Sequence, residues 1–283
     1  MPIPEILIMI VGMGDPESGD TDAWAQALFP GGSLVTTGDR KVMYTGAREI
    51  HLFEVIYEDS NEAIRQKFET LSHLLPSATP EQVKDSLEDY AYDVVENVLL
   101  RGALDAAQLR FVQTYARALK RALELVGPTG DIHDARIGVL SHSLGTYIGY
   151  EGIYRAFDTA ALVQVVDVNL VTCAPMLAPI YHVLHALGAD RYLTENACRK
   201  PYKRTASGRW YSMIRRCGAL YNRKDPFIHI NDAAFYARTP DNDLVDEFRL
   251  FSTDTPLKRF WEGHSMIESY IAHNREVIAS WLF

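Results

Sequence analysis

The segment RIGVLSHSLGTYIGYEGIYRAF, residues 136–157, constrains the fold more strongly than any other part of the sequence. Residues 137–140 form a short apolar run, which is typical of a strand buried on both faces of a sheet. From Leu144 onward, apolar and small residues recur at helical spacing. The chain is therefore predicted to change from strand to helix across residues 141–145, with Ser143 at the tip of the turn.

A side chain at such a tip requires small neighbours two residues away on either side. The turn forces the backbone toward an unfavourable φ/ψ combination, and a larger side chain at either neighbour would crowd the strand or the helix. Ser141 and Gly145 satisfy this requirement. The alternative register, with Ser141 as nucleophile, would put Val139 at a small position, and we reject it. For this segment alone, an ordinary strand-to-helix turn without catalytic function is the competing interpretation.

The sequence Ser-His-Ser-Leu-Gly resembles the nucleophile elbow, G-x-S-x-G, of the α/β-hydrolase family, with Ser141 in place of the first glycine. The resemblance implies an α/β fold with a mostly parallel central sheet of about six strands and helices on both faces. It also implies a single domain over residues 1–283. Ser143 would be the nucleophile, and a carboxylate and a histidine should follow later strands.

A glycine-rich turn follows the first predicted strand. Residues 6–11 are apolar throughout and lead into Gly-Met-Gly at residues 12–14, where amides can point toward an anion. The resemblance implies that the backbone amides of Met13 and Leu144 form an oxyanion hole. Because Val11 stands where the family often has histidine, the first donor is either Met13 or Gly14.

Asp225 and His264 occupy the positions that the family uses for the other two members of its triad. Asp225 follows a strand predicted at 210–214 or 219–222, and His264 lies between a strand at 247–251 and the terminal helix. The order serine, aspartate, histidine is that of the family. The competing acids and bases are Asp241, Asp243, Asp254, His229 and His273.

Three further segments have predicted roles. Residues 61–75, 81–100 and 103–126 read as helices, and because one helix suffices for a crossover, 59–102 is predicted to be a helical insertion that pads the sheet or forms a homodimer surface. Residues 174–209 are predicted to be a lid, with a packed helix and a solvated loop as the favoured alternative. Residues 33–46 form a loop or a hairpin.

Composition restricts the class of protein. The chain has 283 residues, 47% hydrophobic and 23% charged, as is usual for a globular protein, and its net charge of -9 argues against nucleic-acid binding. Cys173, Cys198 and Cys217 are widely spaced, so no disulfide framework or zinc site is expected, and a cytoplasmic location fits best. The first apolar run is too short to span a bilayer.

The resemblance implies a serine hydrolase that cleaves a carboxylic ester or thioester through an acyl-serine intermediate, as esterases and lipases do. The substrate would be a small acyl ester or a lipid, and no metal or cofactor is required. Two alternatives remain. One is an acyltransferase with the same triad, and the other is a binding or scaffold protein with this fold and no catalytic activity.

Overall fold

The computed structural model describes the central sheet and most of the segments that cover it. The described residues are 3–12, 20–56, 79, 81–82, 85–89, 104–158, 167–188, 200, 202–204, 210–230, 236, 243–253 and 260–283. The predicted insertion at 59–102 lies outside these residues apart from 79, 81–82 and 85–89. Most of the second half of the predicted lid also lies outside them.

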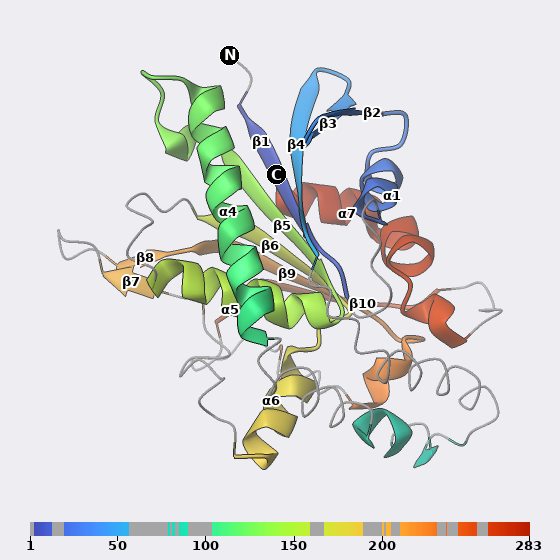
Figure 1. The fold of residues 1–283 in the computed structure, drawn as a ribbon. Helices are drawn as coiled ribbons and strands as arrows, with labels where there is room; N and C mark the ends of the chain where they lie inside the picture. The colour runs from blue at the N-terminus through green and yellow to red at the C-terminus, as the bar shows by residue number, and fades with distance from the viewer. Residues whose placement is uncertain are drawn as a thin grey trace.

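An eight-stranded mixed sheet forms the centre of the molecule, in the order β10-β9-β6-β5-β1-β4-β3-β2 (Figure 1). Six neighbouring strands are parallel: β10 (Glu247–Phe251), β9 (Ile214–Asn222), β6 (Val168–Cys173), β5 (Arg136–His142), β1 (Glu5–Ile10) and β4 (Arg48–Val55). The strands β3 (Arg40–Thr45) and β2 (Ser33–Thr37) add an antiparallel edge.

The prediction of about six strands was therefore too low for the sheet as a whole. The additional pair comes from residues 33–46, which form the hairpin that the sequence left undecided. Four of the five residues of β2 are exposed, so this strand lacks the apolar pattern by which the inner strands could be recognised. In contrast, all six residues of β1 are buried, as expected for a strand in the middle of a parallel sheet.

The two strand alternatives before Asp225 correspond to different sheets. Residues 219–222 belong to β9, which is longer than predicted and joins the main sheet. Trp210–Ser212 forms β8, which pairs with β7 (Tyr202–Arg204) in a separate two-stranded sheet. The strand that leads to Asp225 is thus the second alternative.

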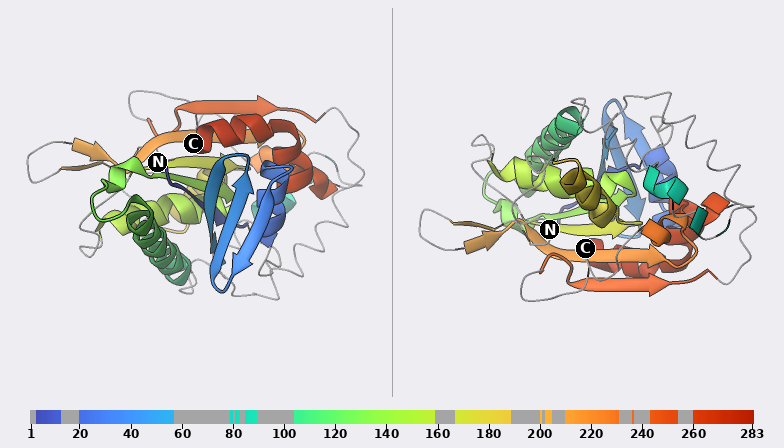
Figure 2. Two further views of the ribbon diagram at one scale, coloured as in Figure 1. Left: turned by 90° about the horizontal axis from the view of Figure 1, so that it is seen from above. Right: turned by 90° about the horizontal axis from the view of Figure 1, so that it is seen from below.

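Helices cover both faces of the main sheet (Figure 2). On one face lie α4 (Leu104–Val126), α5 (Leu144–Asp158) and α6 (Leu177–Ala186), whose buried side chains share one apolar core. On the other lie α1 (Asp20–Leu28), the π-helix η8 (Met266–Ile271) and α7 (Ala272–Leu282), which share a second core. The short 3-10 helices are η3 (Ile132–Asp134), η5 (Pro226–Ile230) and η7 (Phe260–Gly263).

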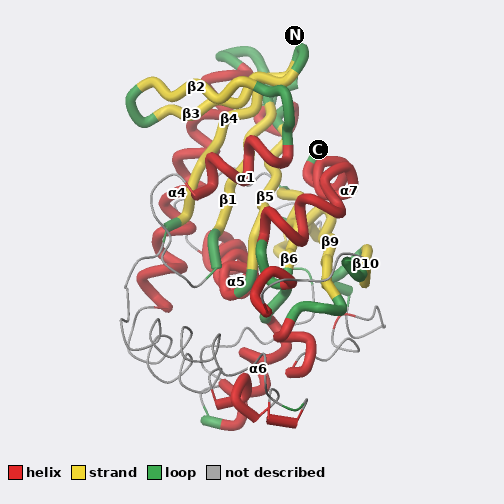
Figure 3. Tube along the Cα trace, turned by 90° about the vertical axis from the view of Figure 1, so that its right-hand side faces the viewer, coloured by secondary structure: helices red, strands yellow, loops and turns green. Residues whose placement is uncertain are grey.

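The carboxyl ends of the parallel strands meet near α6, as Figure 3 shows from the side. Seven of the ten residues of α6 are buried, so the first part of the predicted lid is a packed helix over the described residues. A lid role for residues 174–209 stays a prediction. No helix within the described segments combines the length and the apolar character needed to cross a membrane.

We predict that Gly145→Ala is strongly destabilising whereas Gly149→Ala, one turn later in α5, is not. A Cβ at Gly145 would lie 2.4 Å from the carbonyl oxygen of Val11, a backbone atom that cannot rotate away. At Gly149 the nearest atom, at 2.9 Å, is the Cδ1 end of the Ile10 side chain. Overpacking should lower the free energy of unfolding of Gly145→Ala by about 2 kcal/mol or more. At residue 149, alanine favours the helix over glycine by up to about 1 kcal/mol, which should offset the contact with Ile10.

Urea unfolding of the two variants and the parent chain measures both effects. Equal free energies of unfolding for the two variants would show that β1 and the start of α5 are not in such close contact.

Candidate active site

Ser143 has a strained backbone at the junction of β5 and α5. Its φ of 54° lies in the left-handed region, which residues other than glycine rarely adopt. Three hydrogen bonds hold the turn. The Ser143 N–H donates to the carbonyl oxygen of Cys173 at 3.0 Å, while the Ser143 carbonyl oxygen accepts from the Thr146 N–H at 2.9 Å and from Thr146 Oγ1 at 2.7 Å. Such strain costs on the order of 1–3 kcal/mol and is found mainly at functional sites.

The neighbours of Ser143 have the small size that the sequence analysis required. Ser141 is fully buried in β5, and its hydroxyl donates to the carbonyl oxygen of Val171 at 3.2 Å. A Cβ at Gly12 would lie 2.7 Å from the Cβ of Ser143. Gly12, which follows β1, therefore lies directly against the serine.

One of the two predicted oxyanion donors can be examined. Leu144 is the first residue of α5, so its N–H has no acceptor within the helix, and over the described residues no other acceptor binds it. Met13 and its alternative Gly14 lie outside the described residues. The helix start thus offers one amide beside Ser143 for a developing negative charge.

Asp225 and His264 are hydrogen-bonded to each other. His264 Nδ1 lies 2.8 Å from Asp225 Oδ2, and both side chains are buried. An ionised carboxylate can only accept, so Nδ1 carries the proton and a neutral ring keeps its lone pair on Nε2. The other carboxylate oxygen, Oδ1, accepts from the N–H of Phe227 at 3.0 Å. The pair therefore has the tautomer that a general base needs.

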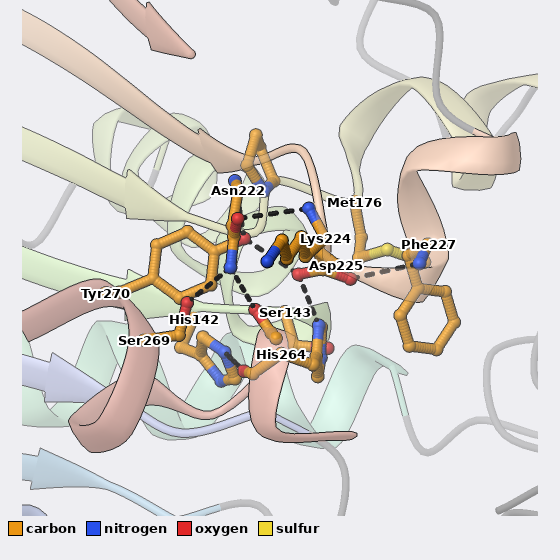
Figure 4. A network of polar contacts seen from close by, with 12 residues as sticks. His142, Ser143, Met176, Asn222, Lys224, Asp225, Phe227, His264, Ser269 and Tyr270 are labelled. Carbon is orange, nitrogen blue, oxygen red and sulfur yellow. Dashed lines mark hydrogen bonds and ion pairs between the residues drawn. The ribbon is translucent and has the colours of Figure 1, made fainter. Parts of the chain in front are cut away.

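The structure brings this pair to the same edge of the sheet as Ser143 (Figure 4). The link is His142, the residue before the serine, whose Nε2–H donates to the carbonyl oxygen of His264 at 2.7 Å. The two imidazole rings lie 4.7 Å apart between centroids. Across the described residues, Ser143 Oγ and His264 form no hydrogen bond, and such contacts commonly tighten only when substrate binds.

His142 is buried, and its environment keeps it neutral. Burial first, and then the neighbouring His264, lower its pKa well below the usual value of 6.5. Its ring also packs edge-on against Trp24 and Tyr270. The sequence alone indicates no role for His142, because only the fold shows that its ring contacts the loop that carries His264.

Tyr270 and Asn222 complete a polar network that the sequence analysis also missed. Tyr270 donates its hydroxyl to Asp225 Oδ2 at 2.7 Å, and burial, reinforced by Asp225, raises its pKa well above 10.0. Asn222 donates from Nδ2 to the carbonyl oxygen of Gly263 at 3.2 Å and to Ser269 Oγ at 2.8 Å. Tyr270 thus remains a donor, and Asn222 fastens the loop before His264 to the end of β9.

The competing triad residues lie elsewhere or cannot be placed. Asp243 accepts from the backbone N–H of Lys200. His273 Nδ1 bonds to the carbonyl oxygen of Ser269 inside the last helical segment. Asp241, Asp254 and the side chain of His229 are outside the described part of the chain. Of the acids and bases considered, only Asp225 and His264 are seen together near Ser143.

Comparisons with known proteins add nothing to this geometry. No protein-family model, no curated protein and no solved structure matches the chain. Function must therefore be inferred from the site itself.

We predict that His142 makes the protein less stable in acid. Its pKa is lowered in the folded state, so below about pH 6.5 the unfolded chain binds a proton that the folded chain does not. Stability therefore falls as pH falls. When the pH is lowered from 7.5 to 5.5, the free energy of unfolding should fall by about 1 kcal/mol less in His142→Gln than in the parent. Glutamine can still donate a hydrogen bond but does not titrate.

Urea unfolding at the two pH values measures the difference. Substitution of the exposed His133 by glutamine is the matched control and should leave the pH dependence of the parent unchanged. A His142→Gln variant with the same pH dependence as the parent would contradict the assignment of a neutral His142.

Proposed function

We propose that the chain is a serine hydrolase that cleaves a carboxylic ester or thioester through an acyl-serine intermediate. The observation that carries the proposal is the 2.8 Å hydrogen bond from His264 Nδ1 to Asp225, formed beside a serine held at a φ of 54°. A buried aspartate that orients an imidazole next to a strained serine is the arrangement that nucleophilic catalysis by serine requires.

The roles of the residues follow from where protons can go. His264 Nε2 accepts the proton of Ser143 Oγ as the oxygen attacks the acyl carbon, and Asp225 stabilises the imidazolium that results. The protonated imidazole then donates its proton to the leaving alcohol or thiol. Water, activated by the same nitrogen, releases the acid and restores Ser143.

The tetrahedral intermediate needs donors for its oxyanion. The N–H of Leu144 is one proposed donor, and the resemblance to the α/β-hydrolase family suggests Met13 or Gly14 as the second. Each such donor contributes on the order of 3 kcal/mol to the stability of the transition state. The start of α5 adds a favourable electrostatic field at the same place.

The topology supports assignment to the α/β-hydrolase family without depending on the motif. Ser143 follows β5, Asp225 follows β9 and His264 comes after β10, and these strands are parallel within one sheet. Carboxyl ends of parallel strands lie at one edge, so three residues distant in sequence converge there. The order serine, aspartate, histidine along the chain is that of the family.

The two described cysteines are relevant to the cellular location of the protein. Cys173 and Cys217 are both buried free thiols, which suits a reducing, cytoplasmic environment. We include that location in the proposal.

We predict that a fluorophosphonate probe labels the protein and that Ser143→Ala abolishes the labelling. The probe reacts only with a serine whose hydroxyl is activated by a base, and Ser143 is the serine that we propose His264 activates. Fluorescence of the labelled band on a denaturing gel, after incubation of folded protein, is the measurement.

Ser141→Ala is the matched control, since Ser141 is two residues away and its hydroxyl is bonded to the carbonyl oxygen of Val171. It should keep its labelling. Absence of labelling in the parent chain would favour a scaffold without catalytic activity, and loss in Ser141→Ala alone would make Ser141 the nucleophile.

A further inference from the structure

A cavity lies away from the proposed active site, between α4 and the strands β3 and β4. Its volume is about 540 Å³, within the range of small-molecule sites. The helix α4 contacts β4, and Figure 1 shows the β2–β3 hairpin at the edge of the sheet. None of Ser143, Asp225 and His264 lines the cavity, which we call the α4 groove.

The α4 groove is positively charged in an acidic protein. Three acidic side chains line it, Asp39, Glu54 and Glu124. Six basic side chains line it as well: Arg40, Lys41, Arg110, Arg117, Lys120 and Arg121. The groove thus has an excess of three positive charges, whereas the whole chain has a net charge of -9. A local excess of this kind attracts anions.

Some of these charges are already paired inside the protein. Lys41 forms ion pairs with Asp22 at 2.8 Å and with Glu54 at 2.9 Å. Glu124 pairs with Arg121 at 3.0 Å and with Arg40 at 4.0 Å. These pairs occupy two of the three acidic side chains of the groove.

The remaining cations are Arg110, Arg117 and Lys120, which form no ion pair with any described acid. Arg110 donates from Nη1 to the carbonyl oxygen of Ile56, and Arg117 donates from Nη2 to Thr114 Oγ1. These bonds hold the two guanidinium groups at the wall of the groove and leave their other N–H groups available. Planar guanidinium groups match phosphate oxygens well.

The α4 groove also contains a guanidinium group held in a fixed direction, and apolar side chains. His51 is only 4% exposed, and its Nδ1 accepts from Arg121 Nε at 3.3 Å, which fixes the direction of that guanidinium. Phe53, Val55 and Ile56 add apolar lining. A few fixed cations around apolar surface are typical of sites for small anionic ligands with an apolar or planar body.

We propose that the α4 groove binds a small phosphate-bearing molecule, with Arg110, Arg117 and Lys120 contacting its phosphate groups. The proposal does not depend on the hydrolase function. Inorganic pyrophosphate is the simplest probe, since it carries only the groups that these cations recognise.

Isothermal titration with pyrophosphate at 150 mM salt tests the proposal. We expect saturable binding to one site, weakened at least tenfold in the double variant Arg117→Gln/Lys120→Gln because charge-assisted contacts are lost. Both side chains are exposed and glutamine suits a helix, so the fold and the fluorophosphonate labelling should be unchanged.

The matched control is Arg249→Gln/Arg275→Gln, which removes the same charge from two exposed side chains on β10 and α7. It should bind as the parent does. Equal weakening in both double variants would indicate general attraction of anions and overturn the proposal. So would absence of saturable binding, or binding of a long polyanion such as heparin without any of pyrophosphate.

Discussion

The strained turn at Ser143 is the constraint on which the rest of the site depends. A residue with a side chain holds a φ of 54° only if its surroundings fix it, and here β6, α5 and Gly12 all do so. Gly145 allows the backbone of β1 to approach closely, and Gly12 lies against the serine. The hydroxyl is thereby presented at the sheet's edge and not drawn into the helix.

Close backbone packing also positions Asp225 and His264. A Cβ at Gly263 would lie 2.2 Å from the carbonyl oxygen of Lys224, so only glycine lets the loop before His264 pass so close to Asp225. Asn222 bonds to that loop from β9, and His142 bonds to it from β5. The imidazole is therefore located by backbone contacts on two sides, and its bond to Asp225 fixes the direction of the ring.

The sequence predicted the parts of this arrangement that depend on local pattern. Buried strands at 6–11 and 137–140, the turn at Ser143 and the helix from Leu144 follow from apolar runs and spacing, and the structure has them. The β2–β3 hairpin was undecided because its exposed residues carry no such pattern. The sequence pattern places Tyr270 on the apolar face of a helix. Its hydrogen bond to Asp225 depends on the tertiary packing of a π-helix, which that pattern does not predict.

A crystal structure of the protein after reaction with a fluorophosphonate would show whether Ser143 is the nucleophile and His264 its base. We expect a phosphorus atom bonded to Ser143 Oγ, a phosphonyl oxygen facing the N–H of Leu144, and His264 still hydrogen-bonded to Asp225 with Nε2 turned toward the adduct. A phosphonyl group on any other side chain, or an imidazole pointing away from the modified Ser143, would contradict these roles.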